Sequence, residues 1–340
     1  MLRGGVIGFG RMGITHYSIL NTHPDVQFVA VCDPSKFLLG GLRKYTSLKI
    51  FTDYREMFDG TDMDFVIVAT PTVSHAEIVK TAIEKGIHLF VEKPFSLTSK
   101  DGQELVTMLE GKNLVNQVGY FLRSNEVFKA VKKLIAEDFI GEPIHYKNEM
   151  YGQAVLKASK SSWRSKEHMG GGCALDFASH CIDLADYLFG RAETVSGTVF
   201  KSVYSENVED AVYSTLEHQN GVSGNIMVNW SDESCRRPFN RIEVFGKKGK
   251  IIADRQEYRL YLRKADSGGH FEKGWNVCYL PELDKGVRFS IRGTDFTRQL
   301  DDFIECIKGN ETKTPCTFAD ALRTDVVIEK MRKDSATRSN

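Results

Sequence analysis

The sequence predicts an α/β Rossmann domain with a doubly wound parallel sheet, followed by a C-terminal α+β domain with an open, mainly antiparallel sheet. Three observations lead to this prediction. Short apolar runs alternate with helical patterns up to residue 120, a glycine-rich turn directly follows the first run, and long runs of alternating polarity begin at residue 193. A chain of 340 residues is long enough for two domains. We therefore expect a first domain over residues 1–120 and a second over residues 121–335.

The first domain is expected to contain a parallel sheet, because its apolar runs are nearly continuous. Strands that are covered on both faces have this pattern. The expected strands are at 4–8, 26–32, 49–51, 63–70, 86–92 and 113–120. The helical patterns between them are at 12–20, 54–58, 75–86 and 99–111.

The second domain changes to an alternating pattern, which is typical of antiparallel strands with one solvated face. A helix is expected at 125–141, strands and turns over 193–204, 210–230 and 240–254, closing helices near 295–308 and 318–332, and a loose tail at 334–340. Helices on one face would leave the other face of the sheet open. We therefore expect a homodimer or homotetramer that forms through this sheet.

Composition excludes several classes of protein. Lys+Arg and Asp+Glu both total 45, so the chain lacks the basic excess of a nucleic-acid binder. Seven scattered cysteines form no C-x-x-C pair, which favours a reducing compartment over a disulfide framework. The sequence shows neither a signal-peptide pattern nor an apolar run of the ~18 residues that a membrane span needs. We expect a cytoplasmic protein that does not bind membranes.

The glycine-rich turn predicts a dinucleotide site. It follows the first strand, opens a helix, and consists of Gly8, Phe9, Gly10, Arg11, Met12 and Gly13. Such a turn brings backbone N–H groups against a pyrophosphate. Asp33, 20 residues after Gly13, is placed to bind the adenosine ribose. Its charge would repel a 2′-phosphate, so we predict NAD, with NADP possible because of Arg11 and Lys36. The competing interpretation is a plain glycine turn with a helix-capping Asp33.

Two later strand ends carry further candidates, because ligands bind beyond the carboxyl ends of strands in such sheets. The candidates for cofactor binding are Thr70, Pro71, His75, Glu92 and Lys93. Taken alone, Lys93 is more often a solvated surface charge, and His75 is more often a helix-start or packing residue.

The segment at 170–190 places Asp176 four residues before His180, after the three glycines 170–172. Four residues are about one helical turn, so the two side chains would share one face. The glycines would let the backbone approach a cofactor or substrate closely. A zinc site that also used Cys173 and Cys181 is excluded, because two turns of helix are too long for one tetrahedral ion. We therefore predict no metal.

At this point the chain resembles the Gfo/Idh/MocA oxidoreductases, which include glucose-fructose oxidoreductase and inositol 2-dehydrogenase. The resemblance covers nearly the whole chain, and its motifs occur in order: VIGFGRMG, ATPTVSH, VEKPF, GYFLR, IGEP, WR, GGGCALDFASHCID and RIEVFGKKG. It implies that Lys93, Asp176 and His180 converge on the substrate carbon beside the nicotinamide. It also implies that Trp163 and Arg164 lie near the nicotinamide end, although Trp163 could equally be a core residue.

The implied reaction is hydride transfer between a nicotinamide and a hydroxyl or carbonyl carbon of a sugar, nucleotide-sugar or cyclitol. Oxidation of an alcohol needs a base for the hydroxyl proton. We assign the base to His180, with Lys93 as the alternative, while Lys93 would stabilise a developing alkoxide and Asp176 would orient His180 or bind substrate. Asp183, one turn further, is expected to be structural.

Three alternatives remain. Arg123 and Arg236, with the neighbouring Arg237, are either solvated charges or contacts for a substrate carboxylate or phosphate. Some relatives are non-catalytic NAD(P)-binding regulators, which lack the catalytic Lys or His, whereas both are present here. An imine or tetrapyrrole reductase on the same scaffold is less favoured, because three polar groups around one carbon suit hydroxyls.

Overall fold

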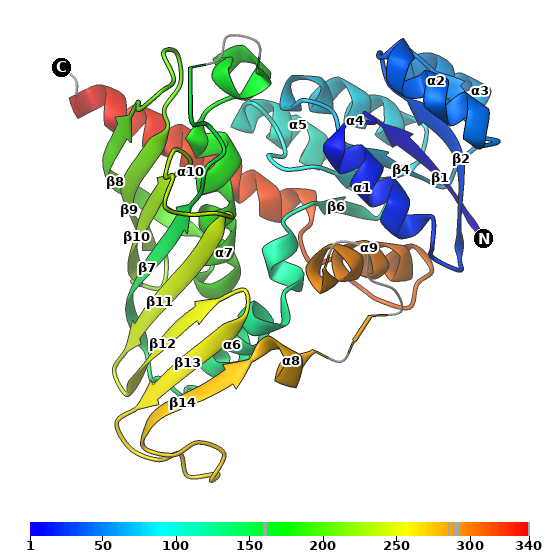
Figure 1. Ribbon diagram of the computed structural model, residues 1–340. Helices are drawn as coiled ribbons and strands as arrows, with labels where there is room; N and C mark the ends of the chain where they lie inside the picture. The colour runs from blue at the N-terminus through cyan, green and yellow to red at the C-terminus, as the bar shows by residue number, and fades with distance from the viewer. Residues whose placement is uncertain (159–161, 285, 288–292, 339–340) are drawn as a thin grey trace. The chain divides into compact units, whose positions relative to one another are not determined.

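The computed structural model describes residues 1–158, 162–284, 286–287 and 293–338 (Figure 1). The chain forms two compact units: Met1–Phe121 with Gly286–Leu322, and Leu122–Lys285 with Arg323–Asn340. The second domain was expected to run without interruption over 121–335. The structure differs in that 286–322 belong to the first unit.

The first unit contains a six-stranded parallel sheet with the strand order β3-β2-β1-β4-β5-β6. This order and its parallel pairing are those of a doubly wound Rossmann sheet, as predicted. The strands are β1 (Leu2–Ile7), β2 (Val26–Cys32), β3 (Lys49–Phe51), β4 (Phe65–Val68), β5 (His88–Val91) and β6 (Asn116–Val118). The strand order reverses at β1, and both the glycine turn and the ends of β4 and β5 lie at the carboxyl edge of this sheet.

Helices cover both faces of this sheet, and Figure 1 shows α1 and α9 on one face and α4 and α5 on the other. The helices are α1 (Arg11–Leu20), α2 (Lys36–Tyr45), α3 (Tyr54–Gly60), α4 (His75–Glu84), α5 (Ser99–Leu109) and α9 (Thr294–Ile307). Helix α2 was not among the predicted helices. Its two glycines and its one buried residue, Leu39, give only a weak helical signal.

Helix α9 explains why 286–322 belong to the first unit. Its residues Leu300, Phe303 and Ile304 are fully buried in the core that β1 and β4 also line. The ring of Phe303 packs edge-to-face on Phe65 and on Phe90, with centroids 5.9 Å apart in both pairs. Burial of such side chains contributes roughly 1.5–3 kcal/mol each, so α9 is an integral layer of the Rossmann unit.

The second unit contains an eight-stranded mixed sheet with the strand order β14-β13-β12-β11-β7-β10-β9-β8. Its strands are β7 (Pro143–Tyr151), β8 (Ala192–Lys201), β9 (Ala211–His218), β10 (Ser223–Asn229), β11 (Phe239–Gly246), β12 (Gly249–Asp254), β13 (Glu257–Leu262) and β14 (Gly274–Tyr279). All neighbours are antiparallel except β7 and β10. The prediction of an open, mainly antiparallel sheet is confirmed.

Strands β7, β13 and β14 were not among the predicted strands. Strand β7 lies in the middle of the sheet, between β11 and β10. Its inward residues are Tyr146, Asn148 and Met150, so a buried amide interrupts the apolar pattern. The Nδ2 of Asn148 donates to the carbonyl oxygen of Cys181, 2.9 Å away, whereas its buried Oδ1 has no hydrogen-bond partner among the described residues.

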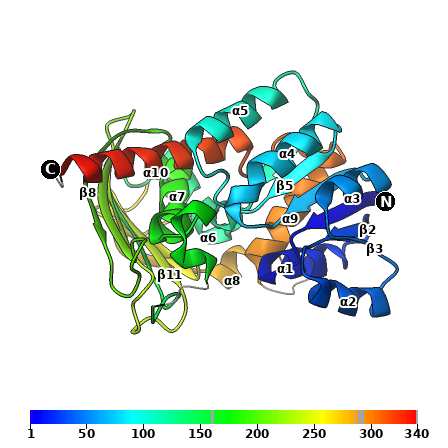
Figure 2. The ribbon, with the colours of Figure 1, turned by 90° about the horizontal axis from the view of Figure 1, so that it is seen from above.

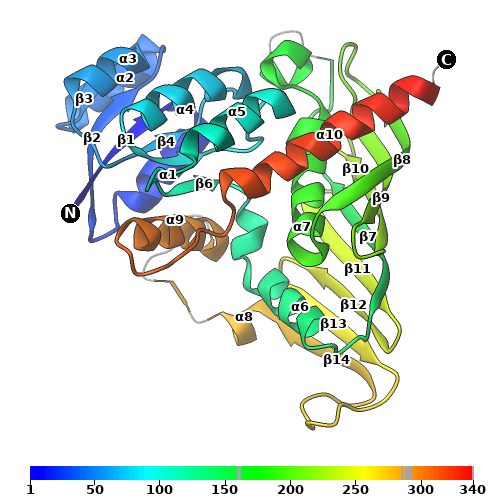
Figure 3. The same ribbon diagram turned by 180° about the vertical axis from the view of Figure 1, so that it is seen from behind.

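Helices of the second unit lie on one face of its sheet, as Figures 2 and 3 show for α7 and α10. They are α6 (Glu126–Ala136), α7 (Ser179–Phe189), the short α8 (Leu280–Leu283) and α10 (Phe318–Arg338), which belongs to this unit from Arg323 onward. The tail at 334–340 was expected to be loose, but α10 continues to Arg338, and the last two residues lie outside the described part. The Asp334 carboxylate accepts the backbone N–H of Thr198 at 2.6 Å, which fixes this end of α10 to β8. Among the described residues, no helix is long and apolar enough to cross a membrane.

Candidate active site

The glycine turn has the geometry of a pyrophosphate cradle. Gly8 has a φ of +88°, and a Cβ there would lie 2.7 Å from the backbone of Ala69. A Cβ on Gly13 would lie 1.9 Å from the carbonyl oxygen of Gly8. A Cβ on Gly10, in contrast, would meet nothing within 4 Å. Gly10 is the N-cap of α1, and no side chain caps this end of the helix. Helix α1 thus begins at a residue without a capping side chain, as helices that bind an anion at their N-terminus do.

Asp33 lies beside this turn, directly after β2. Its Oδ2 accepts the backbone N–H of Phe9 at 2.6 Å, and its Oδ1 accepts that of Ser35 at 2.8 Å. Each carboxylate oxygen can accept a second hydrogen bond, so ribose hydroxyls can still bind. The cap of α2 is Ser35 rather than Asp33. The turn and Asp33 therefore fit a dinucleotide.

His75 connects the two other strand ends that the sequence analysis singled out. Its ring is fully buried, with Nε2 3.0 Å from the carbonyl oxygen of Thr70 and Nδ1 3.1 Å from that of Pro94. Burial lowers the pKa of His75, although the hydrogen bonds to carbonyl groups oppose this. A ring enclosed in this way holds the ends of β4 and β5 together. The structure thus argues against the predicted contact of His75 with the cofactor.

Glu92 is also a buried group, only 8% exposed. Its Oε1 lies 2.5 Å from Nε2 of His16, and its Oε2 accepts the backbone N–H of Lys93 at 3.2 Å. These contacts fix Glu92 beside Lys93, and its contact with the cofactor stays a prediction. His16 was not predicted as a site residue, because its only signal in the sequence is its place three residues after Gly13, on the buried face of α1.

In the second unit, the three glycines permit close packing within the protein itself. A Cβ on Gly171 would lie 2.4 Å from the carbonyl oxygen of Arg164. Gly172 has a φ of +107°, and a Cβ there would lie 2.5 Å from Oε1 of Glu209. We expected the backbone at these glycines to approach a cofactor or substrate closely. Instead, Gly171 lies against the backbone of Arg164, and Gly172 lies against the carboxylate of Glu209.

Asp176 lies in a π-helical turn, Ala174–Ala178, and His180 lies in the first turn of α7 that continues from it. The sequence predicted an ordinary α-helix here. π-helical turns are rare in proteins, and many of those that occur lie at functional sites. Both side chains are largely buried, with 8% and 5% of the residue exposed. Glu209 holds the start of the turn, because its Oε1 accepts the N–H of Ala174 at 2.8 Å.

Arg164 is brought against Asp176 by the segment before the glycines. Its Nε donates to Oδ2 of Asp176 at 2.9 Å, and its guanidinium lies 4.7 Å from the ring centre of Trp163. Trp163 is partly exposed, in a 3₁₀ turn (Trp163–Ser165), and is not a core residue. The arrangement adds a charged partner for Asp176 that sequence spacing did not indicate.

Arg123 is not placed as a substrate-binding residue. Its side chain is 4% exposed, and its guanidinium pairs with Asp183 at 2.8 Å and with Asp186 at 3.2 Å. Asp186 also pairs with Arg323 at 2.8 Å. A buried guanidinium whose charge is already balanced supports the fold. This corrects the predicted role of Arg123 and agrees with the structural role predicted for Asp183.

Arg236 is exposed on the loop between β10 and β11. The carbonyl oxygen of Arg236 accepts Nε2 of Gln153 at 3.0 Å. Pro238 of the same loop packs near the π-turn, because a Cβ on Gly152 would lie 3.2 Å both from Pro238 and from the ring of Phe177. The loop therefore lies beside the segment that carries Asp176.

One group among the described residues has the spacing of a metal site: His23, Asp301 and Glu305, with ligand atoms within 4.8 Å of one another. Nδ1 of His23 accepts the N–H of Asp25 at 3.1 Å, and its Nε2 lies 2.9 Å from Oδ1 of Asp301. Both ring nitrogens of His23 thus have partners within the protein itself. Cys173 and Cys181 are buried, and burial raises the pKa of both thiols. These properties suit side chains that pack in the protein core rather than bind an ion.

Two sequence models of one protein family match the chain. The model described as "Oxidoreductase family, NAD-binding Rossmann fold" matches residues 2–120. The model described as "GFO/IDH/MocA C-terminal domain" matches residues 128–252.

Similar proteins include named dehydrogenases. scyllo-Inositol 2-dehydrogenase (NAD(+)) of Bacillus subtilis (strain 168) is 26% identical, over 92% of this chain and 87% of its own length. Myo-inositol 2-dehydrogenase of Thermotoga maritima is 28% identical, over 84% and 87%. The structure of levoglucosan dehydrogenase in complex with NADH matches with a TM-score of 0.87 at 23% identity, over 99% and 97% of the two chains. At that identity the match shows a shared fold.

Proposed function

Because this chain belongs to the GFO/IDH/MocA family of oxidoreductases and its first domain is an NAD-binding Rossmann domain, we propose that it catalyses reversible hydride transfer on a sugar, nucleotide-sugar or cyclitol. Lys93, Asp176 and His180 are the proposed active site. The observation that carries the proposal is the paired Asp176: a largely buried carboxylate on a π-turn, held by Arg164, four residues before His180.

The proposed chemistry needs few groups. Bound NAD supplies the acceptor for a hydride, which leaves the substrate carbon with the electron pair of the C–H bond. His180 takes the hydroxyl proton as the O–H bond breaks and the C=O bond forms, and Lys93 donates a hydrogen bond to that oxygen. Asp176 binds a neighbouring hydroxyl or orients His180. In the reverse direction His180 returns the proton.

NAD is held, in this proposal, by the glycine turn 8–13 and by Asp33, with Thr70 and Pro71 at the end of β4. The N-terminus of α1 supplies N–H groups for the pyrophosphate, and the Asp33 carboxylate accepts ribose hydroxyls. The same carboxylate disfavours a 2′-phosphate, which supports NAD over NADP. Trp163 and Arg164 are proposed to lie toward the nicotinamide end.

The substrate class follows from the relatives together with the polar side chains of the site. The inositol 2-dehydrogenases act on cyclitols by name. The structure of the WlbA dehydrogenase of Bordetella pertussis was solved in complex with NADH and UDP-GlcNAcA. It matches with a TM-score of 0.87 at 20% identity, over 99% of this chain and 96% of its own. Arg236, exposed beside the π-turn segment, is our candidate contact for a substrate phosphate.

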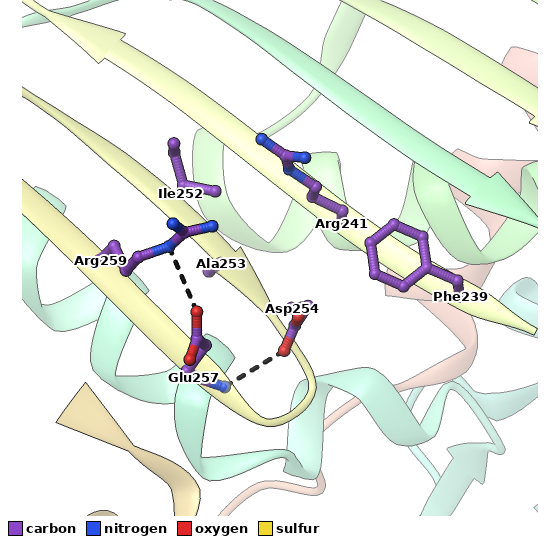
Figure 4. Close-up of a pocket in the computed structure, with 7 residues that line it drawn as sticks. All are labelled: Phe239, Arg241, Ile252, Ala253, Asp254, Glu257 and Arg259. Carbon is purple, nitrogen blue, oxygen red and sulfur yellow. Dashed lines mark hydrogen bonds and ion pairs between the residues drawn. The ribbon is translucent and has the colours of Figure 1, made fainter. Parts of the chain in front are cut away.

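The open face of the large sheet is the proposed contact between copies of the chain. A depression of about 240 Å³ lies on this face. Figure 4 shows the charged and apolar side chains that line it: Phe239, Arg241, Ile252, Ala253, Asp254, Glu257 and Arg259. The edge strand β14 adds Trp275, Val277 and Tyr279, which are 44–54% exposed. A face with both charge signs and apolar groups suits packing against its own copy. We propose a homodimer or homotetramer.

The test is a dehydrogenase assay with purified protein, NAD or NADP, and a panel of cyclitols, sugars and nucleotide-sugars. We expect NADH formation with one substrate class, and a loss of about 10²-fold or more in turnover in His180→Ala and in Lys93→Ala, with NAD affinity retained. Lys100→Ala, an exposed lysine on α5, is the matched control. Normal turnover in His180→Ala would refute the active site. NAD binding without turnover on any substrate would favour the regulator.

A further inference from the structure

Glu209 accepts two consecutive backbone N–H groups at the start of the helical segment that carries Asp176. Its carbonyl oxygen accepts the N–H of Cys173 at 3.0 Å, and its Oε1 accepts that of Ala174 at 2.8 Å. The first N–H groups of a helix have no acceptor within the helix itself. The main chain and the side chain of one glutamate therefore fix the start of the π-turn to the chain just before β9.

Gly172 joins this anchor to both partners of the Arg164–Asp176 pair. Its N–H donates to the carbonyl oxygen of Arg164 at 3.1 Å, and its own carbonyl oxygen accepts the N–H of Asp176 at 3.1 Å. Its φ is +107°, and a Cβ there would lie 2.5 Å from Oε1 and 3.0 Å from Oε2 of Glu209. Glycine adopts this backbone conformation without strain and leaves room for the carboxylate. Gly172 and Glu209 are thus fitted to each other.

Asp210 makes the chain beside Glu209 a firm support. Its buried carboxylate accepts the backbone N–H groups of residues 203–205 at 2.6–2.8 Å. It also accepts Nε1 of Trp230 at 2.6 Å. The ring of Trp230 packs edge-to-face on Phe177 of the π-turn, with centroids 6.4 Å apart. Because hydrogen bonds to a carboxylate are strong, Asp210 fixes both the chain that carries Glu209 and a ring that contacts the turn.

The contact between Asp176 and Arg164 depends on where the π-turn lies. Asp176 is the third residue of this turn, and its Oδ2 accepts Nε of Arg164 at 2.9 Å. Such a hydrogen bond is lost once its two heavy atoms separate to about 3.6 Å. A small displacement of the turn would therefore release the guanidinium from the carboxylate.

We propose that Glu209 is a positioning residue, which holds Asp176 against Arg164 by anchoring the start of the π-turn. It acts through its reach and its acceptor oxygen rather than through its charge. The catalytic consequence rests on the proposed function, in which Asp176 binds a substrate hydroxyl or orients His180. The positioning itself involves residues of the second unit alone, so it can be tested without cofactor or substrate.

Chemical modification of Arg164 reports whether its pair with Asp176 is intact. The protein is treated with an arginine-selective dicarbonyl reagent, and the modification rate of Arg164 is followed by peptide mass spectrometry. The side chain of Arg164 is 30% exposed, so the reagent can reach it. In Asp176→Ala the rate should rise by about 3-fold or more, because a neighbouring carboxylate stabilises the charged, unreactive form of a guanidinium. That variant gives the rate of the released arginine.

Three substitutions of Glu209 separate its reach from its charge. Glu209→Leu has no acceptor, and Glu209→Asp keeps the charge on a side chain that is one methylene group shorter. Both should approach the Arg164 rate of Asp176→Ala. Glu209→Gln keeps the length and an acceptor oxygen, so its rate should equal that of the unmodified protein. Glu206→Leu, which changes an exposed glutamate of the same loop, is the matched control and should leave the rate unchanged.

Two other arginines of the second unit calibrate each sample. The side chain of Arg123 is 4% exposed and should stay unmodified while the unit is folded. Arg191 is exposed and should react at one rate in every variant. An unchanged Arg164 rate in folded Glu209→Leu and Glu209→Asp would overturn the proposal. Faster modification in Glu209→Gln would overturn it too, because the charge would then be the cause.

Turnover is measured separately from this modification. We expect kcat of Glu209→Leu to fall by about 10-fold or more, since a misplaced group near the reacting atoms slows the reaction. Glu209→Gln should restore it, and the affinity for NAD should be unchanged in both. Normal turnover in His180→Ala would reject the proposed active site and leave the result for Arg164 standing. An unchanged Arg164 rate, in contrast, rejects only the positioning role of Glu209.

Discussion

Nε of Arg164 donates to Oδ2 of Asp176 across 2.9 Å, and the guanidinium lies over the ring of Trp163. This contact joins a short 3₁₀ segment to the π-turn that leads into α7. It depends on Gly171, where any Cβ would collide with the carbonyl oxygen of Arg164. The glycine run is thus the means by which the chain brings a cation to the buried Asp176.

Removal of this cation should impair turnover. In Arg164→Ala, Asp176 loses its charged donor, and we expect kcat to fall by about 10-fold or more. Arg164→Lys should recover only part of the loss, because an ammonium does not reproduce the planar guanidinium. Steady-state kinetics check this, with His168→Ala, an exposed residue of the same segment, as control. Equal kcat in Arg164→Ala and the unmodified protein would contradict it.

Asp33 should set the preference between the two dinucleotides. Asp33→Ala removes the carboxylate that Phe9 and Ser35 hold in place, so the affinity for NAD should fall by about 10-fold and the preference over NADP should narrow. Titration of both cofactors checks this, with the exposed Asp59→Ala as control. An unchanged ratio of the two affinities would remove Asp33 from the site.

The buried pair of Arg123 and Asp183 should matter for stability. Arg123→Ala leaves Asp183 and Asp186 buried without that partner, which costs about 3–5 kcal/mol in the free energy of unfolding. Urea unfolding measures the loss. Arg236→Ala, on an exposed loop, should change stability by less than about 0.5 kcal/mol. A small effect in Arg123→Ala would mean that water reaches the network.

Glu209 should make stability depend on pH. Burial raises the pKa of Glu209 in the folded protein, so its contribution is fully present below the unfolded pKa and is lost as the pH rises through the folded pKa. Glu209→Gln keeps an acceptor for Ala174 and removes the charge. The variant should therefore gain stability over the unmodified protein near about pH 8 and lose that gain near about pH 5. Denaturant unfolding at both values gives the comparison; a gain that is independent of pH would argue against the charge as its cause.

The open sheet face should carry the contact between copies. Val277→Glu places a charge among the exposed side chains of β14, opposite Arg259 in the strand register, and we expect the assembly to dissociate. Sedimentation velocity measures this. Val203→Glu, at a comparably exposed valine outside the strands of the sheet, is the control. An assembly that survives Val277→Glu would place the contact elsewhere.

The sequence by itself determined what local patterns encode. Continuous apolar runs identified all six strands of the Rossmann sheet. The dinucleotide motif, the turn from Gly8 to Gly13 with Asp33, was recognised because a strand, glycines, a helix and an acidic residue follow one another within about one βαβ unit. Alternation identified five of the eight strands of the second sheet, and the four-residue spacing drew attention to Asp176 and His180.

Only the tertiary structure decided which distant residues meet. Helix α9 joins the first unit because Phe303 packs on Phe65 and Phe90, and nothing in its own amphipathic pattern specifies that partner. Arg123 lost its predicted role for the same reason, since its partners lie about 60 residues away. The contacts of His16 with Glu92 and of Arg164 with Asp176 are also long-range pairings. Such pairings are formed by packing and charge in three dimensions, and they leave no periodic trace in the chain.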